Sequence, residues 1–525
     1  MADDLEIILF FLLVAVTALT ALARILDVPY PILLVVGGAA VGFAPGIPDV
    51  ELEPDLVLLF FLPPLLFNAA YFASVRDLRR NLRVITLQAV LLVLATMCAV
   101  AVVLHAMVPE IPWAAAFAFG AIVSPTDPLA AVTIAQRVGV PRRIVTVVEG
   151  ESLVNDGTAL VAYRVAVGAA VGGSFDLLDA TGEFVVNVLG GAAVGAAVAL
   201  VLLVALRRLV SDSTLGVTVS LTAGFAAYLP AEHLHVSGVI AAVTVGLVLG
   251  HQAHQISTSA SRLRGYAFWE VLVFLLNAVL FVLVGLQLPG ILEDQERSAG
   301  ELLALGAAAG AVVILSRVVW GNTTPYVIRA LDRRPSQRER RVGWRPRMVL
   351  AWSGMRGSVS LAAALALPEG FPERDLLVFL TLCVIFATLV LQGLTLPWLI
   401  RKLGVVDDGE AAREELLARK QATKAALDRL EVLQAEDWTR DDTIERMLRQ
   451  YDFRYRRLRQ RALGVSEEDE EDLDERSRLY QRTVRDVLDT QRAELVRMRD
   501  RGDISDSVLH SLQRELDLED QRLEI

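Results

Sequence analysis

Apolar stretches follow one another along the chain until about residue 400, and short polar segments separate them. Each stretch is about 17 to 25 residues long, the length with which a helix crosses a bilayer. The pattern therefore predicts an all-α polytopic membrane protein with thirteen transmembrane helices. The expected spans are 5–26, 29–46, 55–73, 84–108, 112–136, 143–171, 184–206, 214–231, 235–251, 266–288, 300–322, 346–367 and 375–400.

The composition changes sharply after the last span. Up to Lys402 the chain holds 27 of its 50 Lys and Arg and 29 of its 61 Asp and Glu, so the last 123 residues carry the other 23 and 32. This division predicts a transmembrane domain over 1–404 and a cytosolic helical domain over 405–525. In the tail we interpret the acidic stretch 466–475 as a solvated linker. An apolar helical stripe is expected at Leu416, Leu417, Leu427, Leu430 and Leu433.

The connections between the spans alternate in charge. Those that follow odd-numbered spans carry 22 Lys and Arg residues, whereas only Arg297 and Arg374 lie in the others, which are acidic. Basic residues collect on the cytoplasmic side of membrane proteins. We therefore expect the N-terminus outside, the C-terminus in the cytoplasm, and a location in the plasma membrane.

Two spans are interrupted. Span 5 contains S-P-T-D-P (124–128), where the prolines remove helical donors, and span 12 contains W-S-G-M-R-G-S (352–358), where two glycines loosen the helix. Opened backbone at membrane depth is tolerated only inside protein or along a cavity. The spans lie seven apart, an odd offset that reverses orientation as an inverted repeat requires. Such a pair indicates the binding site of a secondary transporter.

Few ionisable residues remain at membrane depth, where each charge costs about 2.5 to 3.5 kcal/mol. Three of them lie in the stretch E-G-E-S-L-V-N-D-G-T-A (149–159), and the others lie further along this span or in other spans. We place Glu149 in a solvated position at the end of its span and expect Glu151 to pair with an arginine. The full set is Asp127, Glu149, Glu151, Asp156, Arg164, Arg317 and Arg356.

Residues four apart share a helix face, so Ser152 lies over Asp156. Their carboxylate and hydroxyl are hard oxygen ligands that suit an alkali cation, and Asp127 with the opened backbone at Thr126 can add to them. The predicted Na⁺ ligands with a negative charge are thus Asp156 and Asp127. Nothing in this set suits zinc, which prefers Cys or His.

Four stretches together resemble the sodium/proton exchanger family of monovalent cation/proton antiporters (NHE/NhaP-like). They are F-L-P-P-L-L-F-N-A-A-Y-F (61–72), S-P-T-D-P-L-A-A-V (124–132), G-E-S-L-V-N-D-G-T-A (150–159) and M-R-G-S-V-S-L-A-A-A-L (355–365). The resemblance covers the membrane domain but not the tail. It implies a thirteen-helix fold with inverted repeats, in which two broken helices cross, and a homodimer.

The resemblance also implies roles for single residues. Asp156 would bind the cation and the proton, with Asn155 as its partner. Glu151 would form an ion pair with Arg317 or Arg356. Many members have an acidic residue where this chain has Asn68, which can donate a carbonyl oxygen but brings no charge. Further ligands would be Asp127, Thr126 and Ser152.

These observations predict a secondary active transporter, not an enzyme, that exchanges Na⁺ or Li⁺ for protons. The Asn155–Asp156 pair, in place of two aspartates, is associated in the family with electroneutral exchange. The alternatives are K⁺/H⁺ exchange, a cation channel on the same frame, and an intramembrane aspartyl hydrolase, which would leave Asn155 and the second broken helix unexplained. The expected partners are monovalent cations, protons, membrane lipid and a second copy, with no cofactor and no nucleic acid.

Overall fold

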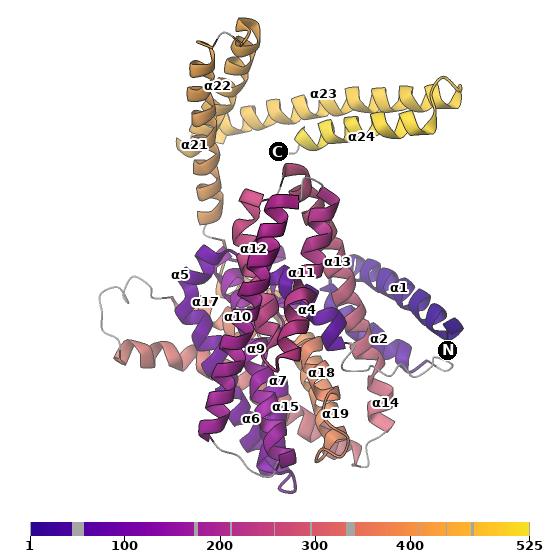
Figure 1. Cartoon of the computed structure of the whole chain (residues 1–525), viewed down its shortest axis with the longest axis vertical. Coiled ribbons are helices and arrows are strands. Elements are labelled where there is room, and N and C mark those ends of the chain that lie inside the picture. The colour runs from indigo at the N-terminus through magenta and orange to yellow at the C-terminus, as the bar shows by residue number, and fades with distance from the viewer. Residues whose placement is uncertain are drawn as a thin grey trace. The chain divides into compact units, whose positions relative to one another are not determined.

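The computed structural model describes residues 2–44, 57–172, 177–209, 213–256, 258–293, 297–331, 342–407, 409–436, 438–463 and 467–523. Within these ranges the regular structure is helical and no strand occurs. The contacts divide the chain into two compact units, Met1–Asp407 and Asp408–Ile525 (Figure 1). The division lies at residue 407, where the composition led us to expect it at 404.

Helices account for most of the first unit. Seven helices among the described residues are long and apolar enough to cross a membrane, and four shorter apolar helices accompany them. Each expected span overlaps at least one helix, while the number of crossings stays a prediction. The helices are α1 (Ala2–Ile25), α2 (Tyr30–Gly42), α4 (Leu62–Phe72), α5 (Val75–Thr86), α6 (Val93–Met107), α7 (Trp113–Val123), α8 (Pro128–Val138), α9 (Arg142–Gly172), α10 (Leu177–Leu209), α11 (Ser213–His233), α12 (Gly238–Ile256), α13 (Ser259–Leu286), α14 (Leu288–Glu293), α15 (Ala299–Leu331), α17 (Trp344–Trp352), α18 (Ser358–Leu365), α19 (Arg374–Phe386) and α20 (Gly393–Leu403).

Three segments have π-helical geometry that the sequence pattern did not predict. They are η1 (Val57–Phe61), η2 (Leu87–Leu92) and η3 (Ala387–Gln392). The segment η2 joins α5 to α6, and η3 joins α19 to α20, so each interrupts a continuous helix. Short π-helical turns inside α-helices occur often at functional sites.

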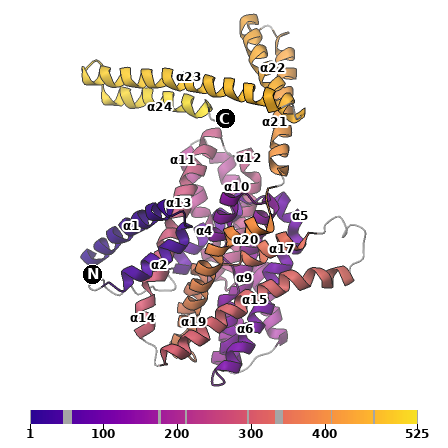
Figure 2. The same cartoon turned by 180° about the vertical axis from the view of Figure 1, so that it is seen from behind.

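Buried apolar side chains divide the helices of the first unit into two bundles. The larger cluster draws on α1, α2, α6 to α9, the second half of α13, α14, α15 and α17 to α20, which we name the crossing bundle. A second cluster draws on α4, α10, α11, α12 and the first half of α13, which we name the flanking bundle. Between them lies a third cluster, the seam, formed by Leu62, Leu66, Ala70, Leu153, Tyr228, Val239, Ala242 and Val243. Figure 2 shows α15, α17, α19 and α20 from behind.

The two predicted helix breaks are present. The helix α7 ends at Val123 and α8 begins at Pro128; likewise, α17 ends at Trp352 and α18 begins at Ser358. Proline is well suited to the first turn of a helix, where its missing N–H has no partner to lose. The structure therefore places two non-helical segments, 124–127 and 353–357, inside the crossing bundle.

The second unit consists of helices that pair in chain order, α21 with α22 and α23 with α24. Their bounds are α21 (Glu410–Leu433), α22 (Asp441–Leu463), α23 (Glu467–Asp500) and α24 (Asp506–Leu523). Two expectations for the tail were wrong. The acidic stretch from Glu467 onward belongs to α23 and is not a linker. Leu417 is exposed, although the rest of the expected stripe holds: Leu430 is buried, and Leu416, Leu427 and Leu433 are half-buried.

Candidate ion-binding site

The two helix breaks touch each other through their main chains. The backbone N–H of Asp127 donates to the carbonyl oxygen of Met355 at 2.8 Å. Close approach is possible because glycines flank Arg356: a Cβ on Gly357 would press on the Asp127 carboxylate, and one on Gly354 would press on the Arg317 side chain. Both glycines therefore make room for charged groups. The expected crossing of two broken helices is thus present at this point.

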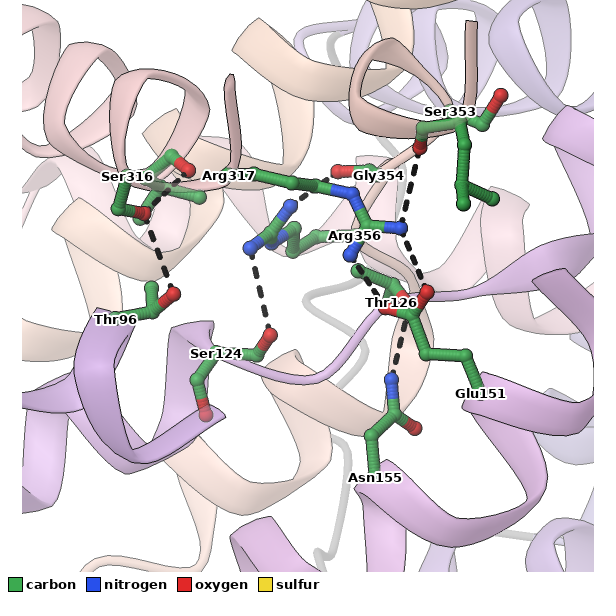
Figure 3. Close-up of polar contacts among 12 residues, drawn as sticks. Thr96, Ser124, Thr126, Glu151, Asn155, Ser316, Arg317, Ser353, Gly354 and Arg356 are labelled. Carbon is green, nitrogen blue, oxygen red and sulfur yellow. Dashed lines mark hydrogen bonds and ion pairs between the residues drawn. The ribbon is translucent and has the colours of Figure 1, made fainter. Parts of the chain in front are cut away.

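Arg356 donates hydrogen bonds to carbonyl groups at the C-terminal ends of α7 and α17, the two helices that stop at the crossing. Its Nε donates to the Val123 carbonyl at 2.9 Å and its Nη2 to the Ser124 carbonyl at 3.4 Å, while Nη1 donates to the Gly354 carbonyl (Figure 3). The residue is 1% exposed. A cation at the carboxyl end of a helix is favourable because the last carbonyls have no partner in the helix. Arg356 therefore serves these carbonyls and does not pair with Glu151, one of the two options that the sequence left open.

Asp127 places a negative charge at the N-terminal ends of α8 and α18. Its Oδ1 accepts from the Leu129 N–H at 2.9 Å, which caps α8. Its carboxylate also lies against Gly357, the residue before α18. A carboxylate at a helix N-terminus is favoured by the unpaired N–H groups there. The crossing thus combines a cation at two helix ends with an anion at two helix starts.

Glu151 forms a buried two-point ion pair with Arg317, the other option. The Arg317 Nη2 lies 2.8 Å from Glu151 Oε2, and Nη1 contacts Oε1. The two side chains are 3% and 2% exposed. Such a pair offsets the desolvation of both charges and holds α15 against α9 in one register, although it need not add net stability.

A chain of hydrogen bonds leads from this ion pair to Asn155 (Figure 3). The Thr126 hydroxyl donates to Glu151 Oε1 at 3.2 Å and accepts from Asn155 Nδ2 at 2.9 Å. The Asn155 side chain is therefore oriented, while its Oδ1 is buried and has no hydrogen-bond partner among the described residues. An oriented carbonyl oxygen without a donor is suited to a cation or a water molecule.

Asp156 stands apart from this network. It is 7% exposed, and no hydrogen bond or ion pair to it is among the contacts of the described residues. Ser152, one turn earlier on α9, is buried to a similar degree, and Asp127 is close enough to interact electrostatically with Asp156. The two buried carboxylates of α9 thus differ: Glu151 is neutralised by Arg317, and Asp156 is available.

Asn68 is the predicted site residue that the structure does not connect. It lies half-buried on α4, whose residues Leu66 and Ala70 meet Leu153 of α9 in the seam. No contact of Asn68 with the other predicted site residues is among those described. Its carbonyl oxygen as a ligand stays a prediction.

Sequence reasoning missed two residues near the crossing. The Thr388 hydroxyl, in η3, accepts from the backbone N–H of Arg356 at 3.1 Å, and Gln392 is fully buried with neither amide atom paired among the described residues. Both are polar positions in the mostly apolar stretch 376–396, whose other polar side chains are Thr381 and Thr395, and this was the available signal.

Interrupted membrane helices that meet around buried oxygen groups define a transport protein of the membrane. Comparison with known proteins agrees: residues 11–402 match the family described as sodium/hydrogen exchanger, transmembrane. The chain belongs to this sodium/hydrogen exchanger family, whose members are multi-pass membrane proteins that exchange cations for protons, and not enzymes.

Individual relatives support the same assignment. The chain is 36% identical to an uncharacterised Na⁺/H⁺ exchanger of Mycobacterium tuberculosis, over 98% of this chain and 96% of the relative. It is 33% identical to the low-affinity Na⁺/H⁺ antiporter NhaS1 of Synechocystis, over 77% and 75%. The solved sodium/proton antiporter NhaP1 of Methanocaldococcus jannaschii shares the fold with a TM-score of 0.60, at 18% identity, over 76% of this chain and 99% of that one.

Proposed function

We propose that this protein exchanges Na⁺ for protons, one for one, across the plasma membrane by alternating access, and so serves pH and sodium homeostasis. The observation that carries the proposal is the state of Asp156, a buried carboxylate on α9 without a described hydrogen-bond or ion-pair partner. Desolvation disfavours a bare carboxylate, so such a group binds either a proton or a cation. Binding one excludes the other, which couples the two fluxes.

The surroundings of Asp156 support a single exchanging charge. Glu151 is neutralised by Arg317, and Asp127 is engaged at the starts of α8 and α18. The neighbour Asn155 is neutral. Asp156 carrying a proton and Asp156 carrying Na⁺ then have the same total charge, so the cycle moves no net charge. In this proposal Ser152, Thr126, Asn155, Asp127 and Asn68 complete the oxygen ligands.

The second candidate is exchange of K⁺ for protons. Its support lies in relatives named sodium, potassium, lithium and rubidium/H⁺ antiporter, from Bacillus pumilus (31% identical over 75% of this chain and 62% of the relative) and Bacillus subtilis (29% over 96% and 77%). Na⁺ and K⁺ both use oxygen ligands, so the site chemistry alone accommodates either. The proposal further includes a homodimer with its N-terminus outside, supported by the family resemblance and by the basic connections.

Everted vesicles from a host that lacks its own antiporters test the function. Na⁺, Li⁺ and K⁺ are each added to vesicles with an imposed proton gradient over a pH series, for wild type and for Asp156→Asn. Glu149→Gln, on the same helix, is the matched control. We expect Na⁺ to dissipate the gradient in wild type and control but not in Asp156→Asn.

The other possible outcomes distinguish between the alternative functions. Exchange retained by Asp156→Asn would overturn the role of Asp156. Dissipation by K⁺ alone would select the second candidate, and Na⁺ flux without proton movement would indicate a channel. An imposed membrane potential should leave the rate unchanged if exchange is electroneutral.

A further inference from the structure

One face of α9 forms the contact between the crossing bundle and the flanking bundle. Leu153 and Leu160 pack in the seam, and a Cβ on Gly157 would come within 2.6 Å of Ile240 of α12. The positions 153, 157, 160 and 164 recur every three or four residues and so share one face of the helix. Asp156 borders this face. The seam is therefore the boundary along which Asp156 would be reached if the two bundles part.

The apolar face ends in a charged contact. Arg164 Nη2 of α9 lies 2.9 Å from Oε1 and 2.8 Å from Oε2 of Glu232, near the end of α11. The side chains of Arg164 and Glu232 are 43% and 31% exposed. A single guanidinium nitrogen thus contacts both oxygens of one carboxylate and joins α9 to α11. The sequence had placed Arg164 at membrane depth without assigning it a partner.

Glu232 is held in place independently of Arg164. Its Oε1 also accepts from the backbone N–H of Gly238 at 3.1 Å, at the start of α12. A carboxylate at a helix N-terminus is favoured there even without a cation. If the ion pair opens, Glu232 keeps this partner and the half-exposed Arg164 is hydrated. Both members are therefore stable in the open state, which makes the contact reversible.

The ion pair lies on a definite side of Asp156. Arg164 follows Asp156 by eight residues, or about 12 Å along the helix. Arg142 and Arg143, at the opposite end of α9, belong to the basic connections assigned to the cytoplasm. The contact is thus on the side that these connections assign to the exterior.

We propose that Arg164 and Glu232 form an outer latch, which closes the exterior end of the seam and opens when Asp156 is exposed to that side. The proposal rests on the proposed function, because it assigns one step of alternating access to a named contact. Apolar side chains in the seam can slide without a preferred geometry, whereas a charged hydrogen bond between Arg164 Nη2 and the Glu232 carboxylate has a preferred distance and direction. The latch therefore favours the outward-closed state over the outward-open state.

Thiol labelling tests the latch without requiring transport. Cys98 and Cys383 are replaced by alanine, and Leu160→Cys provides a reporter in the seam between Asp156 and Arg164. A membrane-impermeant methanethiosulfonate reagent is then applied to intact cells, and the labelling rate is measured. Glu232→Gln is the preferred variant because its amide oxygen can still accept from Gly238. Arg164→Gln and the charge exchange Arg164→Glu with Glu232→Arg complete the set.

We expect about three- to fivefold faster labelling from outside in each single variant, and a return to within about 1.5-fold of the parent in the charge exchange. The controls are Arg297→Gln and Glu373→Gln, which remove an ion pair of 3.1 Å that joins two connections of the crossing bundle. These controls should label at the parent rate. Unchanged labelling in Glu232→Gln, or an equal increase in the controls, would overturn the latch.

The two proposals fail in distinguishable ways. Loss of Na⁺/H⁺ exchange in wild-type vesicles would contradict the proposed function, yet a change in labelling would still establish the latch. Conversely, wild-type exchange with no effect of Glu232→Gln on labelling would leave the function in place and remove the latch.

Discussion

Arg317 and Glu151 face each other as a buried two-point ion pair although 166 positions separate them in the chain. The pair joins α15 to α9, and the Thr126 hydroxyl continues it toward Asn155. The Thr126 hydroxyl therefore links the ion pair to the first helix break. Substitutions in this network should affect folding and transport in separable ways.

Glu151→Gln should strongly destabilise the protein, because it leaves the Arg317 guanidinium buried without a counter-charge. Removing one member of a buried ion pair costs about 3 to 5 kcal/mol. Thermal unfolding of the purified protein in detergent measures the change. The double variant Glu151→Gln with Arg317→Met should recover much of the stability, since no unpaired charge remains. If the double variant unfolds as early as the single one, charge pairing is not the cause.

Arg356→Lys should destabilise the protein despite the retained charge. Lysine carries its three donors on one nitrogen, which cannot match the spread of the guanidinium toward the carbonyls of Val123, Ser124 and Gly354. At least one buried acceptor therefore loses its donor, at a cost of about 1 to 3 kcal/mol. Arg374→Lys is the matched control, because Arg374 binds the carbonyls of Leu365 and Leu367 near the surface. Its cost should stay under about 1 kcal/mol. Equal unfolding temperatures for the two variants would contradict the role of Arg356.

Gly357→Ala should lower the exchange rate about tenfold or more, because the added Cβ displaces the Asp127 carboxylate at the crossing. Gly168→Ala serves as control: it lies on α9, no neighbouring atom lies within 4 Å of the methyl group that alanine would add, and alanine is the better helix former. Proton-coupled Na⁺ uptake measures both. A normal rate in Gly357→Ala would mean that Asp127 can shift without consequence.

The apparent KM for Na⁺ should rise as the pH falls, by about tenfold per pH unit where Asp156 is mostly protonated. The sign follows from competition, because a proton on Asp156 must leave before Na⁺ binds. Initial rates over a matrix of pH and Na⁺ concentration measure the dependence, and the maximal rate at saturating Na⁺ should change much less. A KM independent of pH would show that proton and cation do not share one group.

The helix breaks and the polar stretch of α9 could be predicted because their causes are local. Pro125, Pro128 and the glycines around Arg356 weaken or end a helix through local effects, and charged groups at membrane depth are expensive enough to stand out. The sequence also limited the partner of Glu151 to two arginines. It could not choose between them, because the choice depends on which guanidinium the carbonyls of α7 and α17 engage.

Contacts between distant segments could not be predicted from the sequence either, because they also depend on how the helices pack. Arg164 lies in an expected membrane span, whereas Glu232 lies in an expected connection between spans. No pattern of residues in the sequence indicates that the two side chains pair. The π-helical segment η3 and the bond from Arg356 to Thr388 depend on how α19 packs, as does the burial of Gln392.

The hydrogen bond between the Asp127 N–H and the Met355 carbonyl is made by main-chain atoms alone. Side-chain replacement can alter the charge at the crossing without removing this bond, unless proline replaces Asp127. The relative position of the two helix breaks is thus fixed by a backbone contact, and the chemistry of the crossing depends on the side chains that surround it. Relatives could diverge in cation preference while keeping a common geometric reference point, so selectivity can be re-engineered here one side chain at a time.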